Sequence, residues 1–286
     1  MRIVVTGGAG LLGSRVVALA GSRGHEVRSL AHAELDVTDS ARVRSVLERA
    51  DPDAVIHCAA YTEVDRAEAE PDLARTVNRD GTRNVAEAAA GRGALFVYVS
   101  TDYVFDGQKR TPYLPDDEPA PLSVYGRTKL EGEEVAREVA PDALIARTSW
   151  LYDSGGGFVP AVLMRARRGE PVRVVHDQRG RPTWAAHAAR AILDLLESGV
   201  SGIWHVADGG ECTWAGLARE ALRFSQLDVE VHGVSSEEHG AAACRPAYSV
   251  LDLERTEARL GRRMPDWREA LRSMLYGEAT IREGDC

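Results

Sequence analysis

The sequence predicts an α/β protein in which a doubly wound parallel sheet occupies residues 1–150 and a smaller mixed α/β lobe occupies residues 151–286. Short apolar runs alternate with helical patterns through the first half, which is typical of consecutive βαβ units. These runs are apolar throughout rather than alternating with polar residues, as expected for strands covered by helices on both faces. After Trp150 the pattern loosens, and the glycines at 155–157 make a flexible break.

Each element of the first half follows from its local pattern. The run 2–5 is apolar and ends at Thr6 before a glycine cluster, and the helical spacing that follows ends at Gly21. The helical segment 80–90 is rich in alanine, a strong helix former. The strands expected in this half are 2–5, 25–31, 53–57, 95–99 and 143–148, and the helices are 11–20, 80–90 and 130–139.

The second half mixes shorter elements. Helical patterns cover 158–168, 185–197 and 266–275, and a strand-like run covers 171–175. The helix over 184–198 is expected to pack back on the first part of the chain. The last ~10 residues are polar and are expected to fray.

Composition and charge exclude several classes of protein. The 286 residues are 44% hydrophobic and 28% charged, as in ordinary globular proteins. The net charge of −9 argues against binding to nucleic acid, which requires a basic surface. No apolar run approaches the ~20 residues that span a bilayer, and no signal peptide precedes the opening MRIVVTGG. Cys58, Cys212, Cys244 and Cys286 form no CxxC pair, which indicates a reducing compartment. We therefore expect a cytoplasmic protein that binds neither nucleic acid nor membrane.

A glycine-rich turn follows the first predicted strand and opens the first predicted helix, with the spacing Gly7-x-x-Gly10-x-x-Gly13. Gly7 permits the tight turn, Gly10 lets a pyrophosphate approach the backbone, and Gly13 allows the helix to pack close to the strand. The helix N-terminus at Leu11 and Leu12 supplies unpaired N–H groups and a favourable dipole for phosphates. The pattern predicts a dinucleotide site; the alternative is a structural turn that binds no ligand.

The end of the second predicted strand indicates which dinucleotide binds. An acidic residue there would hold the ribose 2′-OH of NAD, but the segment contains Arg28 and His32 and no carboxylate before Glu34. Arg28 and His32 could accommodate a 2′-phosphate, which favours NADPH and leaves NADH possible. In the alternative interpretation, both are solvated surface residues.

A Y-x-x-x-K pattern places the phenol of Tyr125 and the ammonium of Lys129 on one face of a helix. A nearby cation would lower the pKa of the phenol, and Tyr125 could then donate a proton to a forming alkoxide as general acid. Thr101 follows the predicted strand 95–99, at the edge where sites form in open α/β sheets, and would orient a substrate carbonyl. Taken alone, the Y-x-x-x-K pattern also fits a surface helix pair.

The glycine turn has the T-G-x-x-G-x-x-G form of the extended short-chain dehydrogenase/reductases, which the N-terminal half resembles. Further stretches are similar in order and spacing to the dTDP-4-dehydrorhamnose reductase family, over nearly the whole chain. These stretches are 59–68 (AAYTEVDRAE), 100–107 (STDYVFDG), 147–152 (RTSWLY), 177–183 (DQRGRPT), 245–251 (RPAYSVL) and 265–268 (PDWR).

The resemblance implies a Rossmann domain with a smaller C-terminal substrate lobe, and reduction by NAD(P)H of the 4-keto group of a dTDP-6-deoxy-L-hexulose. It makes Thr101, Tyr125 and Lys129 the catalytic trio, with the lysine on the nicotinamide ribose. It adds Asp36, Val37, Ala59 and Ala60 as cofactor contacts and Thr62, Val64, Asp102, Tyr103 and Trp150 as the lining of the sugar pocket. Arg245 and Arg181 are the candidates for the diphosphate, since a guanidinium grips phosphate bidentately, unless they anchor loops.

The sequence departs from the family pattern in three places. Some dimeric relatives bridge a divalent metal with glutamates at positions where this chain has Arg15 and Ala186, and an arginine cannot ligate a cation. We therefore expect no metal and a monomer or weak dimer rather than a metal-bridged one. The third departure is Tyr248, where many members of the family have Asn.

Two other functions remain open at this point. The chain could be a 4-ketoreductase for another dTDP-6-deoxyhexose of secondary metabolism, because the outcome at C4 depends on how the sugar lies in the pocket. It could also be a non-catalytic subunit resembling the regulatory subunit of methionine adenosyltransferase. The presence of Thr101, Tyr125 and Lys129 counts against that binding role, because a binding protein does not need a phenol with a shifted pKa.

Overall fold

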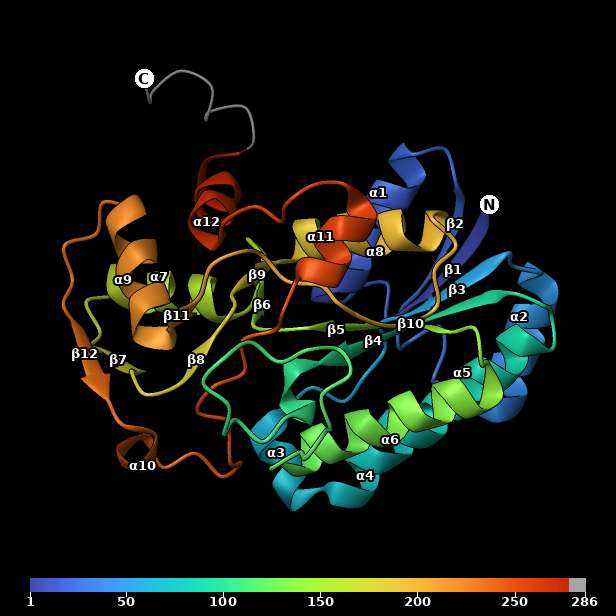
Figure 1. The fold of residues 1–286 in the computed structure, drawn as a ribbon, viewed down its shortest axis with the longest axis horizontal. Coiled ribbons are helices and arrows are strands. Elements are labelled where there is room, and N and C mark those ends of the chain that lie inside the picture. Colours follow the sequence, from blue (N-terminus) through green and yellow to red (C-terminus); the bar gives the residue numbers. More distant parts are fainter. Residues whose placement is uncertain (278–286) are drawn as a thin grey trace.

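A computed structural model of the chain describes residues 1–277 (Figure 1). The polar C-terminal residues that were expected to fray lie, from residue 278 onward, outside the described residues. Within 1–277, no helix combines the length and the apolar character that crossing a bilayer requires.

A six-stranded parallel sheet forms the centre of the molecule, in the order β10-β5-β4-β3-β1-β2. The five strands expected from the first half are present, with ends that shift by up to two residues. The sixth strand, β10, comes from the second half and pairs with β5, so the division of the chain at residue 150 does not divide the sheet. The strands are β1 (Arg2–Thr6), β2 (Glu26–Leu30), β3 (Ala54–His57), β4 (Leu95–Thr101), β5 (Leu144–Thr148) and β10 (Gly202–His205).

Helices cover both faces of this sheet. On one face, α1 (Leu11–Ser22) packs against α8 (Ala185–Glu197), and α11 (Glu254–Leu260) packs against α8 and β10. On the other face lie α2 (Ser40–Ala50), α5 (Gly81–Ala90) and α6 (Val124–Val139), side by side. Each face has its own apolar core, which explains why the central strands carry no polar alternation.

The helix α6 begins six residues earlier than the pattern at 130–139 predicts. The side chain of Ser123 caps its N-terminus by accepting a hydrogen bond of 3.1 Å from the N–H of Gly126. The cap starts the helix just before Tyr125, so both residues of the Y-x-x-x-K pattern are helical.

A second lobe packs beside the carboxyl edge of the sheet, on the left in Figure 1, around its own core that includes the buried side chains of Trp267 and Tyr152. It has three two-stranded pairs: β6 (Leu151–Tyr152) with β9 (Thr183–Trp184), β7 (Val172–Val175) with β12 (Val231–Val234), and β8 (Arg179–Gly180) with β11 (Cys212–Thr213). Its helices are α7 (Phe158–Arg167), α9 (Trp214–Phe224), α10 (Ser236–His239) and α12 (Trp267–Tyr276). The short helices α3 (Val64–Ala69) and α4 (Pro71–Arg75) and a π-helical turn (Thr76–Asp80) precede α5.

Candidate active site

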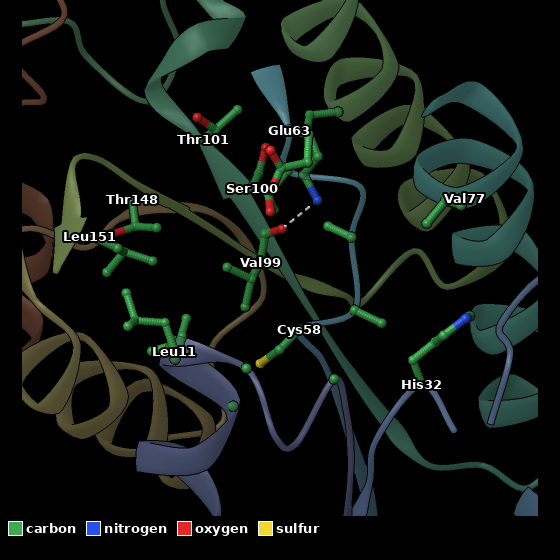
Figure 2. Close-up of a pocket in the computed structure, with 18 of the residues that line it drawn as sticks. Leu11, His32, Cys58, Glu63, Val77, Val99, Ser100, Thr101, Thr148 and Leu151 are labelled. Atoms are coloured by element: carbon green, nitrogen blue, oxygen red, sulfur yellow. Dashed lines mark hydrogen bonds between the residues drawn. The ribbon is translucent and has the colours of Figure 1, made fainter. Parts of the chain in front are cut away.

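A cavity of about 800 Å³ opens at the carboxyl edge of the sheet, where it meets the second lobe. It extends from His32, after β2, past the glycine turn and the ends of β3 and β4, to Thr148 and Leu151 beside Leu11 (Figure 2). Crevices at this edge are the usual ligand sites of open α/β sheets.

The glycine turn forms part of the cavity wall and has the geometry of a phosphate cradle. Gly7 has a φ of +65°, and a Cβ on it would lie 2.7 Å from the backbone nitrogen of Ala59. A Cβ on Gly13 would overlap the carbonyl oxygen of Gly7. The first residue before α1 is Gly10, so no side chain caps the N–H groups of this helix. The turn therefore leaves open backbone donors facing the cavity, which suits a dinucleotide pyrophosphate.

Most residues expected to contact the cofactor line the cavity, and one does not. The lining includes Gly7, Gly10, Leu11, Leu12, Gly13, His32, Asp36, Val37, Ala59, Ala60, Tyr125 and Lys129. Arg28 is exposed in β2 and is not part of the lining, so His32 remains as the basic side chain at this end. The carboxylate of Asp36 accepts hydrogen bonds from the backbone and side chain of Thr38, which lower its pKa and fix the turn.

Thr101 and Tyr125 lie together at the end of β4. The Thr101 hydroxyl accepts a hydrogen bond from the N–H of Tyr103 and donates one to Asp102 Oδ1, each 3.2 Å long. Burial raises the pKa of Tyr125 to about 12, against the smaller lowering effect of its hydrogen bond with Thr101. The expectation that Lys129 lowers this pKa is therefore wrong, because desolvation of the phenol dominates.

Lys129 lies one helical turn after Tyr125, and its own environment explains its weak effect on the phenol. Its Nζ donates a hydrogen bond of 2.8 Å to the backbone oxygen of Val99 and lies 4.1 Å from the ring centre of Tyr98. Burial lowers the pKa of Lys129 to about 7, although the carboxylate of Glu133 raises it. Near neutral pH this ammonium is thus easily deprotonated.

A buried ion pair, which the sequence did not reveal, lies directly behind these residues. The carboxylate of Glu133 in α6 accepts hydrogen bonds of 2.8 and 2.7 Å from Nε and Nη2 of Arg147 in β5, and both side chains are 2% exposed. The same carboxylate accepts the hydroxyl of Ser100, and Arg147 Nη1 donates to the backbone oxygen of Pro115. These hydrogen bonds connect α6 to the ends of β4 and β5. Ser100 itself lines the cavity, and Arg147 precedes Thr148, which also lines it.

A second buried network fixes the loop after β3 to α6. The amide of Asn78, in the π-helical turn, accepts from the N–H of Tyr61 and donates to the hydroxyl of Thr128, at 2.8 and 2.9 Å. Thr128 in turn donates to the backbone oxygen of Tyr125. Single π-helical turns are rare and are often found at functional sites.

The predicted sugar-binding residues divide into two groups. Thr62, Asp102 and Trp150 line the cavity, whereas Val64 and Tyr103 do not. The ring of Tyr103 nevertheless meets the ring of Tyr125 edge-on, with 5.8 Å between centroids.

Arg245 lies beside Tyr103, outside the cavity lining. Its guanidinium is paired with both oxygens of Asp65, at 2.9 and 2.7 Å, and lowers the pKa of that carboxyl to about 2. The guanidinium is thus positioned beside Tyr103 and partly neutralised by Asp65.

Arg181 is an anchor for loops rather than part of this cavity. Its guanidinium donates to the backbone oxygens of Leu251 and Gly210, at 2.7 and 2.8 Å, and it borders a separate surface cleft. These carbonyl oxygens take two of its five N–H donors, and Arg181 is not part of the cavity lining, so its contact with the diphosphate stays a prediction.

The three departures from the family pattern also have structural explanations. Arg15 forms an ion pair with Asp153, which joins α1 to the second lobe, and Ala186 packs at the edge of the core of that lobe. Tyr248 points its hydroxyl at Glu211 and lies outside the cavity lining. Within residues 1–277, no three His, Cys, Asp or Glu side chains gather in a group that could hold a metal ion.

Several lining residues were not among the expected site residues. Thr148 ends β5, Ser100 is the last but one residue of β4, and Thr148 is the register partner of Thr101 in the pairing of β4 with β5. Their position at strand ends was the available signal. The cavity is also lined by Ala9, Ala31, Leu35, Cys58, Glu63, Val77, Val99, Ser149, Leu151 and Gly157.

Two buried polar atoms that line this cavity have no hydrogen-bond partner in the described part of the chain: Asp102 Oδ2 and Thr148 Oγ1. Buried polar groups are almost always satisfied, so these atoms indicate where a polar ligand supplies the missing partner.

The carboxyl of Asp102 gives the free protein a specific pH dependence. Burial raises its pKa to about 7, well above the value of about 3.9 in an unfolded chain. Between these values the folded state keeps a proton that the unfolded state loses, so the stabilisation is complete below about pH 4 and is lost as the pH rises towards 7. From pH 5 to 7 we expect the free energy of unfolding of the wild type to fall, relative to Asp102→Asn, by roughly 2 kcal/mol.

Urea denaturation of both proteins at the two pH values measures this difference. The window ends near pH 7, where Lys129 begins to contribute with the opposite sign, because its lowered pKa makes stability rise with pH above 7. Parallel pH profiles for the two proteins would show that Asp102 is ionised throughout.

Comparisons with known proteins place this geometry among related chains. The family model described as the RmlD substrate binding domain matches residues 1–279. A dTDP-4-dehydrorhamnose reductase of Sinorhizobium fredii is 39% identical over 298 residues, which cover 99% of each chain. A protein of Streptomyces antibioticus named probable dTDP-4,6-dihydroxy-2-methyloxan-3-one 4-ketoreductase is 41% identical over 95% of this chain and 94% of its own. The solved structure of a dTDP-4-dehydrorhamnose reductase from Bacillus anthracis in complex with NADP is 37% identical, with a TM-score of 0.92, over 96% of this chain and 98% of that one.

Proposed function

The chain belongs to the family of the RmlD substrate binding domain, as its motifs indicated, and on this premise we propose that it reduces the 4-keto group of dTDP-4-dehydro-L-rhamnose. It is an oxidoreductase that acts on a sugar-nucleotide ketone, and its cofactor is NADPH. The observation that carries the proposal is the meeting of Thr101, Tyr125 and Lys129 in one cavity with the glycine turn.

The residues present fit the cofactor. The glycine cradle has no room for a Cβ at Gly7 or Gly13, and the uncapped N-terminus of α1 faces the phosphates. His32 and Thr148 both line the cavity; His32 would hold a 2′-phosphate, and the unpartnered Thr148 hydroxyl would face the nicotinamide. When bound, NADPH supplies the hydride that adds to the keto carbon.

Tyr125 supplies the proton in this proposal. Its raised pKa keeps the phenol protonated at neutral pH, which is the form a general acid needs. As the hydride reaches C4, the O–H bond of Tyr125 breaks and the proton goes to the carbonyl oxygen, so the ketone becomes an alcohol. The Thr101 hydroxyl holds the carbonyl in line, and its hydrogen bond with Tyr125 favours the phenolate that remains. Lys129 would hold the nicotinamide ribose.

The other end of the cavity recognises the sugar. Asp102, with its free Oδ2, accepts a sugar hydroxyl, Thr62 contacts the same ring, and Trp150 forms an apolar wall. A buried site of this kind discriminates against sugars that lack the matching hydroxyl, because its polar groups are then left unpaired. Arg245 is the basic candidate for the diphosphate. Its guanidinium already pairs with Asp65, so the diphosphate and this carboxylate would share the guanidinium.

A second candidate is reduction of a different dTDP-4-keto-6-deoxyhexose. The 41% identity to the Streptomyces antibioticus 4-ketoreductase favours it as strongly as the identity to named rhamnose-pathway enzymes favours the first. A non-catalytic regulatory role has no such support, because the relatives are named as reductases.

Product analysis separates the two substrates. The enzyme is offered dTDP-4-dehydro-L-rhamnose and a dTDP-4-keto-6-deoxyhexose of the D series, and the configuration at C4 of each product is read by NMR. We expect a higher kcat/KM for the L sugar and a single product, dTDP-L-rhamnose. Preference for the D sugar would replace the first proposal by the second.

A further inference from the structure

The backbone of Trp150, which forms a wall of the cavity, has an unusual conformation. Its φ is +47°, in the left-handed region that large side chains rarely adopt. Such a conformation persists only where the surrounding structure holds it, and it is often found at functional sites. Trp150 lies between β5 and β6, with its side chain 9% exposed.

The contact that holds this ring comes from the second lobe. Trp214, the first residue of α9, stacks on Trp150 with 3.6 Å between ring centroids and 7° between ring planes. Gly180 of β8 leaves the space for the Trp150 ring, because a Cβ there would lie 2.5 Å from the indole. A nearly parallel stack of this kind restricts both the tilt and the position of the ring.

Trp214 is itself fixed from behind. Its indole N–H donates a hydrogen bond of 3.1 Å to Gln178 Oε1, and Gln178 Nε2 donates one of 2.9 Å to the hydroxyl of Ser236. Ser236 donates in turn to the carboxylate of Asp177, at 2.7 Å. The ring of Phe158 covers Trp214 from α7, at 4.7 Å between centroids. The stack is thus attached to a rigid network and not to a mobile surface side chain.

Trp214 does not line the cavity, whereas Trp150 does. We propose that Trp214 is a positioning residue for the reduction: by stacking on Trp150 it sets the wall against which the sugar ring lies. This inference rests on the proposed function, since it assigns the wall to the sugar. Because the phosphates are assigned to the glycine turn and the sugar to the Trp150 wall, we expect Trp214 to act on the sugar and not on the binding of NADPH.

The test compares Trp214→Leu with the conservative Trp214→Phe and with a matched control, Trp204→Phe. Trp204 lies in β10, donates its N–H to the backbone oxygen of Ser201, and is not part of the cavity lining. We expect Trp214→Leu to lower kcat/KM for the keto sugar by about tenfold to hundredfold, through misplacement of the substrate. The Kd of NADPH is expected to stay unchanged, Trp214→Phe to recover most of the loss, and Trp204→Phe to behave as wild type.

Two measurements besides activity make the result decisive. Stacked indoles give an exciton couplet in circular dichroism, which Trp214→Leu should lose and Trp204→Phe should keep. Calorimetric titration with dTDP-L-rhamnose should show weaker binding to Trp214→Leu whether or not the wild type turns over a keto sugar. A folded Trp214→Leu that binds dTDP-L-rhamnose as tightly as wild type would overturn the inference. Absence of turnover by the wild type would instead count against the proposed function.

Discussion

Replacing Tyr125 by phenylalanine is expected to lower kcat by about 10²–10⁴-fold, the usual contribution of a positioned general acid. The substitution removes one oxygen from a ring that meets Tyr103 edge-on, so the packing of the site is retained. The hydroxyl that is lost would otherwise donate the proton to the ketone oxygen. Its neighbour, Thr101, would still orient the carbonyl, but an aliphatic hydroxyl is too weak an acid to replace the phenol.

The Kd of NADPH for this variant, followed by fluorescence titration, is expected to match that of the wild type, because the phosphates bind at the glycine turn. Tyr61→Phe is the matched control. Its phenol donates to Glu70 in the neighbouring loop, its ring packs in the same small cluster as Tyr125, and it is not part of the cavity lining. We expect it to keep kcat near the wild-type value. A near-normal kcat in Tyr125→Phe would remove Tyr125 from the mechanism.

Replacing Glu133 by alanine is expected to lower the free energy of unfolding by about 3–5 kcal/mol. The change leaves the guanidinium of Arg147 buried without its carboxylate, and desolvation of an unpaired charge is costly. Urea denaturation at neutral pH measures the difference.

Glu138→Ala on the same helix is the control for this prediction. Glu138 pairs with Arg83 at the surface, where its side chain is 65% exposed, and such pairs contribute no more than about 1 kcal/mol. The double variant Glu133→Leu with Arg147→Met should recover much of the loss, since apolar side chains replace both charges. Equal effects of Glu133→Ala and Glu138→Ala would show that the buried pair contributes nothing special.

The sequence was sufficient for those parts of the site that depend on short-range spacing. The glycine turn and the Y-x-x-x-K pattern each lie within a single turn or helix, so the identities and intervals of their residues specify their geometry. Thr101 could be placed because it ends an apolar strand. The five strands of the first half could be predicted because each is a short apolar run in the sequence.

Features that depend on contacts distant in the chain were not accessible in this way. The strand β10 is four residues long and joins the sheet only by pairing with β5, and nothing in its own pattern indicates that partner. Glu133 and Arg147 are ordinary charged residues in sequence, and only the fold buries them together. The two candidate arginines also looked alike, yet Arg181 meets carbonyl oxygens and Arg245 a carboxylate.

The pKa of Tyr125 also could not be predicted from the sequence. The spacing of Tyr125 and Lys129 indicates a cation near the phenol, but the extent of burial decides the sign of the pKa change. Desolvation of the Tyr125 phenol outweighs the charge of Lys129, and the ammonium is directed to the oxygen of Val99. The resulting acid is a phenol that stays protonated, which suits proton donation to a ketone.

The most direct test of the proposed function is the oxidation of NADPH with dTDP-4-dehydro-L-rhamnose, generated in place by a dehydratase and an epimerase. We predict rapid loss of the NADPH absorbance, formation of dTDP-L-rhamnose, and abolition of both by Tyr125→Phe. A folded protein that binds NADPH yet oxidises neither NADPH nor NADH with this sugar would contradict the assignment.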